Sequence, residues 1–158
     1  MHELPHRLVE RRLLSALAVV VLTIVEPTPH AQADAPPCRT TISTDTVFDK
    51  DTGLTWQRAV DAATYNQSDA MTYCSDLVLA GVGWRLPSIK ELQTIVDESK
   101  YNPAIDPIAF PDTPINYFWS SSLYAGDSGS AWYVAFNVGY VYYDSVDTTL
   151  RVRCVRRE

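Results

Sequence analysis

The stretch Gly83–Leu92, GWRLPSIKEL, carries the strongest local structural signal in the chain. Ser88 and Glu91 match the S-x-x-E capping box, in which each side chain satisfies a backbone amide at a helix start. Pro87 disfavours helical backbone at the residue before it. The motif therefore predicts a corner that leads into a helix from Ser88 to about Glu98.

An aromatic residue, an arginine and a proline so close together could also form the edge of a catalytic site. We expect a scaffold instead. Trp84 and Leu86 are predicted to be buried, and Arg85 to be packed or paired with an acid, as these residue types usually are. The apolar stripe of the following helix is expected to face the core and consists of Ile89, Leu92 and Val96.

Helical periodicity predicts another helix upstream, from Gln67 to Leu79. Its apolar positions recur at i, i+3, i+4 and i+7 and are Ala70, Tyr73, Cys74 and Leu77. Asn66 or Ser68 can cap its start, and Gly81 stands where a helix terminator is expected. The periodicity places Cys74 on the buried stripe.

The stretch TVFDKDTGLTW, Thr46–Trp56, predicts two short strands around a turn at Asp51–Gly53. The D-x-D-x-G spacing within it also resembles the start of a calcium loop. Because the later oxygen ligands and the distal glutamate of such a loop are missing, we expect a plain hairpin turn and no metal site.

Prolines interrupt the segment from Asn102 to Asn116 so often that no regular element is expected there. Its apolar residues Ile105, Ile108 and Phe110 indicate a loop pinned to the core. Three strand-like runs follow, which read NYFWSSSLY, SAWYVAFNVGYVYYDS and RVRCVR.

Alternation assigns faces to these strands. In the second run, the residues expected on one face are Trp132, Val134 and Phe136, followed by a turn at Asn137–Gly139 and by Val141 and Tyr143 on the return strand. In the last run Val152 and Cys154 share a face. A buried cysteine on the first helix could reach that face.

Residues 1–33 follow the pattern of a secretory signal peptide. Arginines precede an apolar run, Leu13–Val25, that is shorter than the roughly 20 residues of a membrane span, and Ala31–Ala33 supplies a small-x-small cleavage pattern. An uncleaved short anchor and an amphipathic helix are the alternatives. We expect cleavage, a flexible N-terminal tail at 34–46, one domain at 47–158, and no membrane span after cleavage. The mature protein would be exported to the periplasm, the cell surface or the medium.

All three histidines, His2, His6 and His30, lie in this leader. Imidazole-based catalysis and imidazole metal ligands are therefore excluded for the mature chain. The net charge of −6 argues against nucleic-acid binding, although arginines 151, 153, 156 and 157 form a basic strip in the sequence.

Three cysteines remain in the mature chain, namely Cys38, Cys74 and Cys154. An oxidising compartment favours pairing and leaves one thiol over. Zinc would need four ligands at tighter spacing, so we expect no zinc site.

Several ordered motifs together resemble the Lcl C-terminal domain family, a bacterial family named after a collagen-like adhesin. The motifs are TGLTWQ, AMTYCSDL, GWRLPSIKEL, FPDT, FWSSS, AWYVAFNVG and VRCVR, and they extend from about Phe48 to Arg156. This sequence contains no collagen-like repeat, so the adhesin architecture does not carry over.

The resemblance implies an α+β, C-type lectin-like fold, in which two helices pack on short antiparallel sheets with much irregular loop. A disulfide ties the first helix to the last strand of that fold, which implies a Cys74–Cys154 bridge. The calcium motifs of sugar-binding C-type lectins are absent, so calcium-dependent sugar binding is not expected. The similar formylglycine-generating enzymes need two catalytic cysteines, whereas two of the cysteines here match structural positions.

Domains of this family are frequent targets of diversity-generating retroelements, which implies a variable surface at Asn137–Thr149. Six of the nine tyrosines lie between Tyr117 and Tyr143. Tyrosine gives a large contact area at low entropic cost, although it is also an ordinary strand former. The candidate ligand-binding residues are Asn137, Tyr140, Tyr142, Asp144, Ser145 and Asp147.

We therefore expect an exported, non-catalytic, adhesion-type module that binds an extracellular protein or glycan and needs no cofactor. One alternative is a structural subunit of an envelope assembly. The other is an enzyme, either one that uses carboxylates such as Asp127 and Asp144 or one of the formylglycine-generating type.

Overall fold

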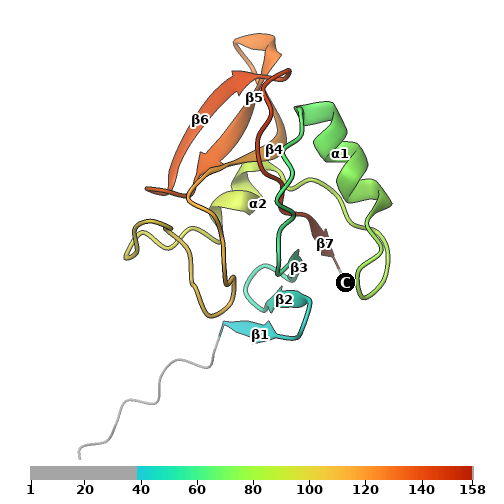
Figure 1. The fold of residues 1–158 in the computed structure, drawn as a ribbon, viewed down its shortest axis with the longest axis vertical. Helices are drawn as coiled ribbons and strands as arrows, with labels where there is room; N and C mark the ends of the chain where they lie inside the picture. Colours follow the sequence, from blue (N-terminus) through green and yellow to red (C-terminus); the bar gives the residue numbers. More distant parts are fainter. Residues whose placement is uncertain (1–38, 158) are drawn as a thin grey trace, which may run out of the picture. The chain divides into compact units, whose positions relative to one another are not determined.

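The computed structural model describes residues 39–157 as an α+β fold with two helices and two antiparallel sheets (Figure 1). The helices are α1 (Gln67–Asp76) and α2 (Ile89–Gln93). The first sheet has the order β1-β2-β3-β7, with β1 (Thr40–Ile42), β2 (Thr46–Asp49), β3 (Leu54–Gln57) and β7 (Val155–Arg157). The second has the order β4-β5-β6, with β4 (Tyr117–Tyr124), β5 (Asp127–Ala135) and β6 (Tyr140–Ser145). The expected leader and Cys38 lie outside the described residues.

The hairpin between β2 and β3 is confirmed as a plain turn. The Asp49 side chain accepts hydrogen bonds from the Asp51 amide at 3.1 Å and the Thr52 hydroxyl at 2.7 Å, and Gly53 has a φ of 67°. Asp49 also binds Arg39 at 2.6 Å. The expectation of little structure up to Thr46 is wrong for β1, because this segment pairs with β2 and shields one of its edges.

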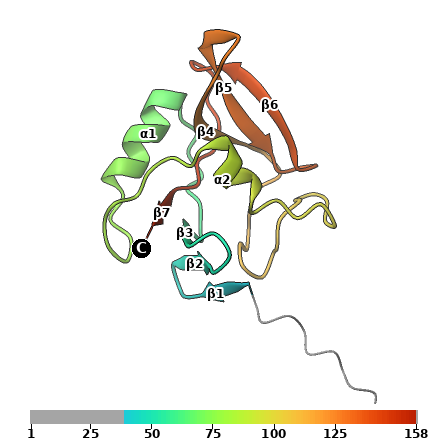
Figure 2. The same cartoon turned by 180° about the vertical axis from the view of Figure 1, so that it is seen from behind.

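The two faces of the β4-β5-β6 sheet pack against different helices. Phe118 and Val134 from one face belong to a core cluster that contains Leu92 of α2. Trp119 and Ala131 from the other face belong to a second cluster that contains Cys74 of α1. In Figure 2, α2 accordingly lies in front of β4 and β5. The sheet is thus the central layer between the two helices.

The helix α1 begins as predicted but ends early. Asn66 is its N-cap and accepts from the Asp69 amide at 2.8 Å. The helix ends at Asp76 because Leu77 adopts an extended conformation, and the positive φ of Gly81 belongs to a later turn. The expected extension to Leu79 is therefore wrong.

The capping box at α2 is confirmed. The Ser88 side chain accepts from the Glu91 amide, and the Glu91 carboxylate accepts from the Ser88 amide at 2.9 Å. Beyond Gln93 the backbone bonds connect residues three apart, and this tighter winding places Ile95 in the core while Val96 is half-buried. The helix is therefore shorter than predicted. At its end Ile95, rather than the predicted Val96, faces the core.

The corner before α2 is scaffold, as predicted. Trp84 and Leu86 are buried. Arg85 forms two charged hydrogen bonds to Glu91, at 2.7 and 2.8 Å. The Arg85 guanidinium, more than any other neighbour, lowers the pKa of Glu91 to about 2. The arginine thus fixes the start of the helix.

The proline-rich loop is pinned to the core by arginines as well as by apolar side chains. Ile105 and Phe110 are buried as predicted, whereas Ile108 is 74% exposed, contrary to expectation. Arg58 donates to the carbonyl oxygens of Ala109 and Ile108 at 3.3 and 3.4 Å. Because these bonds hold the backbone of the loop, the Ile108 side chain is left pointing to solvent.

The disulfide between Cys74 and Cys154 is confirmed, with an S–S distance of 2.02 Å. It joins α1 to the segment before β7, and both cysteines are buried beside Trp84 and Trp119. The resemblance implied this pairing, and the alternation that placed Val152 and Cys154 on one face agrees with it.

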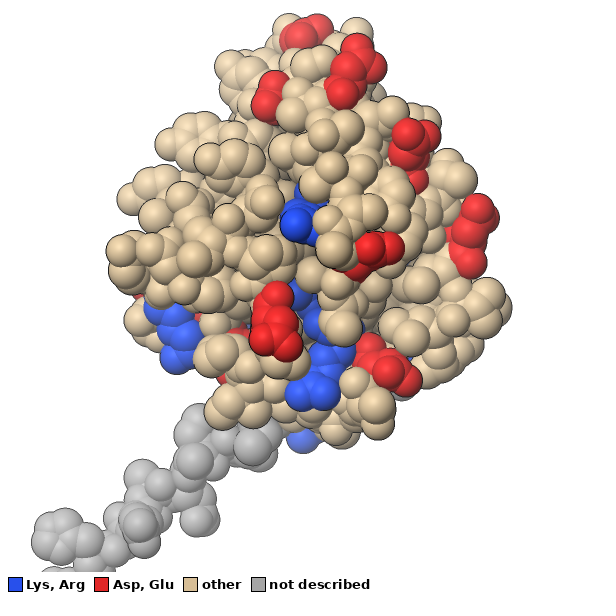
Figure 3. Space-filling model, in the orientation of Figure 1, with Lys and Arg blue, Asp and Glu red and all other residues tan. Residues whose placement is uncertain are grey.

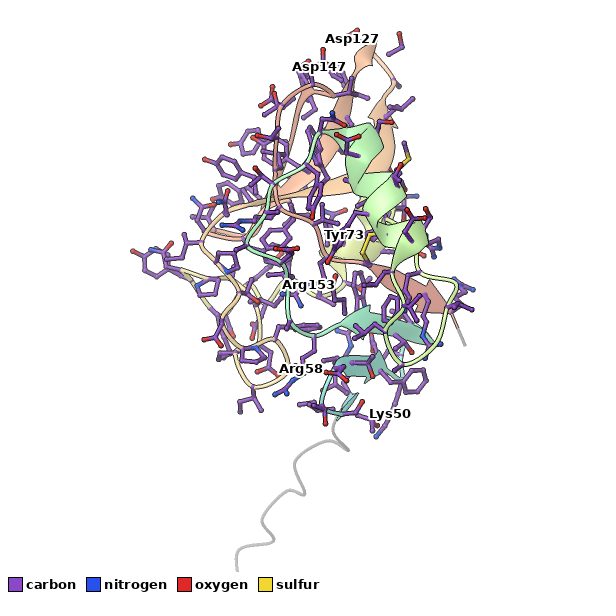
Figure 4. All side chains as sticks on the ribbon, turned by 45° about the vertical axis from the view of Figure 1, so that its right-hand side comes forward. Lys50, Arg58, Tyr73, Asp127, Asp147 and Arg153 are labelled. Carbon is purple, nitrogen blue, oxygen red and sulfur yellow. A yellow bond between two sulfur atoms is a disulfide. The ribbon has the colours of Figure 1, made fainter. Side chains whose placement is uncertain are left out.

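The basic strip noted near the C-terminus is broken up in the fold, because Arg157 is the one of its four arginines that is exposed. Arg153 is fully buried, donates to the carbonyl oxygens of Gln57 and Arg58 at 2.7 Å, and lies among other side chains in Figure 4. Burial lowers its pKa to about 9. Arg156 stacks on the ring of Trp84. Arg153 and Arg156 therefore contact carbonyl oxygens and an aromatic ring of the domain itself rather than attracting an anion.

No helix within residues 39–157 has the length and apolar character needed to cross a membrane.

Candidate ligand-binding surface

The register of the β4-β5-β6 sheet gathers tyrosines on one face. Tyr133 of β5 pairs with Tyr142 of β6, and Ala135 pairs with both Tyr117 of β4 and Tyr140 of β6. Since side chains two residues apart share a face, these tyrosines point to the same side. We call Tyr117, Tyr133, Tyr140 and Tyr142 the aromatic patch.

A glycine in the β5–β6 connection makes this register possible. Gly139 has a φ of 81°, in the region that residues with a side chain rarely adopt. A Cβ at this position would also lie 2.7 Å from Val96. The turn therefore requires glycine both for its conformation and for its close packing, and it fixes which residues of β6 face Tyr133.

The rings of the aromatic patch form a ladder across the three strands. The Tyr133 ring centroid lies 5.2 Å from that of Tyr117 and 6.3 Å from that of Tyr142. Tyr133 is half-buried and meets Trp119 edge-on beneath the surface, at 6.2 Å. Tyr117, Tyr140 and Tyr142 are 43%, 61% and 52% exposed. The patch thus combines a supported central ring with exposed neighbours.

A carboxylate completes this surface. Asp144 follows Tyr142 on the same face of β6, pairs with Ala131 of β5 and is exposed. Burial raises the pKa of the Tyr133 phenol, and the adjacent Tyr117, Asp144 and Tyr142 raise it further. The phenol, which is protonated at neutral pH even at its ordinary pKa, can donate a hydrogen bond.

The structure brings only half of the predicted site residues together. Tyr140, Tyr142 and Asp144 share one face of β6. Ser145 lies on the opposite face. Asn137 is half-buried in the β5–β6 turn, and Asp147 is exposed in the turn after β6. Strand alternation therefore turns Ser145 away from the aromatic patch, the length of β6 separates Asp147 from Tyr140, and Asn137 belongs to the turn rather than to the face of the sheet.

Sequence reasoning missed Tyr117 and Tyr133, which complete the patch. Pairing β5 with β6 across the Asn137–Gly139 turn would have placed Tyr133 opposite Tyr142. No comparable local signal was available for Tyr117, because its strand lies on the far side of β5.

The opposite face carries a second aromatic group that the sequence also did not reveal. Tyr124 stacks on Tyr143 with ring centroids 4.0 Å apart, and Trp132 meets both rings edge-on. Tyr143 is 49% exposed. Because these rings pack mainly on one another, this group offers less free ring surface than the aromatic patch.

Asp127, one of the carboxylates named for a possible enzyme, is held by hydrogen bonds at the start of β5. Asp127 accepts hydrogen bonds from the Gly129 amide and the Ser130 hydroxyl, both at 2.9 Å, and these bonds lower its pKa. A general acid at neutral pH needs a raised pKa. Within residues 39–157, no group of three or more His, Cys, Asp or Glu side chains is arranged to hold a metal ion.

A cavity lies away from the β4-β5-β6 sheet. It has a volume of about 560 Å³, and its lining includes Arg39, Ile42, Trp56, Ile95, Ile108 and Phe110. The indole nitrogen of Trp56 has no hydrogen-bond partner among the described residues, yet it is buried and has almost no accessible surface. A ligand in the cavity could not reach this nitrogen, and the charged lining residues Arg39 and Asp49 already pair with each other.

Comparison with known families now supports the resemblance noted in the sequence. The model of the Lcl C-terminal domain matches residues 45–156. The chain belongs to the Lcl C-terminal domain family. The match contains both helices, the disulfide and the whole aromatic patch, whereas β1 lies outside it. No curated protein matches this Lcl C-terminal domain.

Proposed function

We propose that this Lcl C-terminal domain is an exported, non-catalytic binding module of the C-type lectin-like type, and that it engages an extracellular protein or glycan through the aromatic patch. The observation that carries the proposal is the exposed ladder of Tyr117, Tyr133 and Tyr142, with Tyr140 on the same face. Tyrosine is enriched at binding hot spots because its large ring loses little entropy when it is fixed.

The architecture supports a binding role because scaffold and surface are separate. Two core clusters, a disulfide and the buried Arg153 hold the sheet in place from both sides. The exposed rings contribute little to either cluster. The segment Asn137–Thr149, for which the family resemblance implies diversification, consists of β6 and its two turns. Substitutions at the exposed patch positions of this segment, Tyr140, Tyr142 and Asp144, would change the surface without disturbing the scaffold, whereas Gly139 and Val141 are part of the scaffold.

Export is supported by the disulfide, because such bonds persist mainly in oxidising compartments. The C-type lectin-like assignment is supported by the two helices around a central sheet and by the link from the first helix to the C-terminal segment. The non-catalytic assignment is supported by the pKa of Asp127, which is lowered rather than raised.

The test measures stability and binding on the same two variants. Each variant truncates one tyrosine of β6, and the two tyrosines lie on opposite faces of the strand. The mature domain is first applied to glycan and protein arrays to obtain a ligand. Tyr142→Ala is then compared with Tyr143→Ala, which makes the same truncation one residue further along the strand on the opposite face. We expect Tyr142→Ala to weaken binding by about fivefold or more with little change in thermal unfolding.

Tyr143→Ala should show the opposite pattern, because it removes a ring stacked on Tyr124. It should lower the unfolding temperature while the folded protein keeps its affinity. Loss of binding in Tyr143→Ala together with normal binding in Tyr142→Ala would place the site on the other face and contradict the proposal.

A further inference from the structure

We propose that the group bound by the aromatic patch is a cation, namely an arginine or lysine side chain in a basic segment of a protein partner. The inference rests on the proposed function and narrows its ligand to a protein with exposed positive charge. It follows from the charges that surround the patch and from the chemistry of its rings.

The sheet that carries the patch has no positive side chain of its own. From Tyr101 to Leu150 the sequence contains no lysine, arginine or histidine. The same segment contains five acidic residues, which are Asp106, Asp112, Asp127, Asp144 and Asp147. Acidic side chains and no basic ones are visible at the upper end of the molecule in Figure 3. The surface around β4, β5 and β6 is thus suited to a cation and repels an anion.

Two of these acids lie close together at one end of the sheet. Asp127 and Asp147 are seen there in Figure 4. A backbone hydrogen bond of 2.9 Å from the Val146 amide to the Gly129 carbonyl oxygen joins the start of β5, which carries Asp127, to the turn that carries Asp147. With Asp144 inside the face of the patch, negative charge extends from the rings to this end, which would steer a basic segment along the sheet.

The basic residues on either side of this segment, Lys100 and Arg151, are engaged elsewhere. Lys100 pairs with Asp97 at 3.5 Å. The backbone of Arg151 pairs with that of Phe118 in β4. The Arg151 guanidinium, however, donates to the carbonyl oxygens of Asp61 and Ala63 at 3.1 and 3.5 Å. Arg151 therefore directs its charge toward the 61–63 segment and leaves the carboxylate of the patch without an internal counter-ion among the described residues.

Asp144 keeps an oxygen free for a ligand. Its Oδ1 atom accepts from the Ser145 amide at 2.7 Å. This is the one hydrogen bond to the carboxylate among residues 39–157, so Oδ2 is left for a ligand, and the side chain is exposed. A guanidinium or ammonium group lying over Tyr142 would meet the ring face and this oxygen together, which combines a cation–π contact with an ion pair.

The probe is a short peptide of alternating arginine and serine, with a second peptide that has glutamate in place of arginine and with heparin as an anionic glycan. Binding to the mature domain is measured by calorimetry or fluorescence at low and high salt. We expect the arginine peptide to bind and the glutamate peptide and heparin not to bind. Added salt should weaken the interaction, since exposed charges are screened.

Variants separate a specific site from general attraction to an acidic protein. Asp144→Asn and Tyr142→Leu should each weaken arginine-peptide binding by about two- to fivefold, as expected for an exposed ion pair and for a cation–π contact. Glu98→Gln is the matched control, because it removes the same charge from an exposed position outside the sheet. It should leave the affinity unchanged.

Three results would overturn the inference. Equal weakening by Glu98→Gln and Asp144→Asn would show attraction by net charge alone. No effect of Tyr142→Leu would show that the rings make no contact with the cation. A preference for heparin would refute the cationic ligand and leave the proposed binding function standing. The same conclusion would follow from a neutral array ligand whose binding is lost in Tyr142→Ala and kept in Asp144→Asn. Binding of array ligands that no tyrosine substitution alters would refute both.

Discussion

Removal of the disulfide between Cys74 and Cys154 should cost this domain a large part of its stability. The bridge joins residues separated by 80 positions in the sequence. For a loop of that length, the chain-entropy relation gives about 4.5 kcal/mol at 25 °C. Domains are typically stable by about 5–15 kcal/mol, so a Cys74→Ala/Cys154→Ala double variant should lose between a third and nearly all of its free energy of unfolding.

Packing adds to this effect in the folded state. Both sulfur atoms lie in the core cluster that contains Trp84 and Trp119, and alanine leaves part of their volume empty. The unfolded state changes as well, because a chain without the cross-link expands and exposes more surface. The dependence of the unfolding free energy on urea should therefore become steeper while the midpoint falls.

Urea unfolding followed by tryptophan fluorescence measures both quantities. Cys38→Ala is the control, because Cys38 takes no part in the bridge, and it should leave the free energy of unfolding within about 0.5 kcal/mol of the parent value. A double variant that unfolds at the parent midpoint with the parent slope would refute the loop-closure reasoning. A non-reducing peptide map that links Cys38 to either partner would refute the pairing itself.

Three further outcomes are expected. Glu91→Ala should cost roughly 0.5–2 kcal/mol, the range of a lost helix cap, when unfolding is measured by denaturant titration. Because Arg85 holds the pKa of Glu91 at about 2 instead of 4.5, this contribution is present above pH 4.5 and is lost as the pH falls toward 2, so the parent should lose more stability than the variant over that interval. Arg153→Lys should destabilise the domain by about 1–3 kcal/mol in the same assay, since one ammonium cannot replace a buried fork that binds two carbonyl oxygens and a hydroxyl. Mass spectrometry of the exported protein should show Asp34 as its first residue, and an intact leader on the functional protein would contradict that prediction.

Local signals in the sequence were sufficient for the framework of the fold. The capping box of Ser88 and Glu91 and the hairpin turn at Asp51–Gly53 depend on bonds between residues only a few positions apart. Strand alternation and helical periodicity likewise assigned Cys74 and Cys154 to buried faces. Such features are encoded by neighbours in the chain, so they can be read without knowledge of the rest of the molecule.

Only the tertiary structure decided which side chains the framework buries and which it presents. Ile108 resembles a core residue in the sequence, but the bonds that hold its loop leave it in solvent. Arg153 resembles a surface residue, but carbonyl oxygens distant in the sequence make its burial possible.

The candidate site shows the same division. Tyr140 and Tyr142 are candidate ligand-binding residues in the sequence, and the structure shows that both are exposed. Whether they share a surface with Tyr117 and Tyr133 depends on which strands pair and in what register. The turn at Gly139 and the packing of both helices on the sheet set that pairing. A chain can specify the face of each residue locally, but a surface built from three strands exists only when long-range contacts bring those faces together.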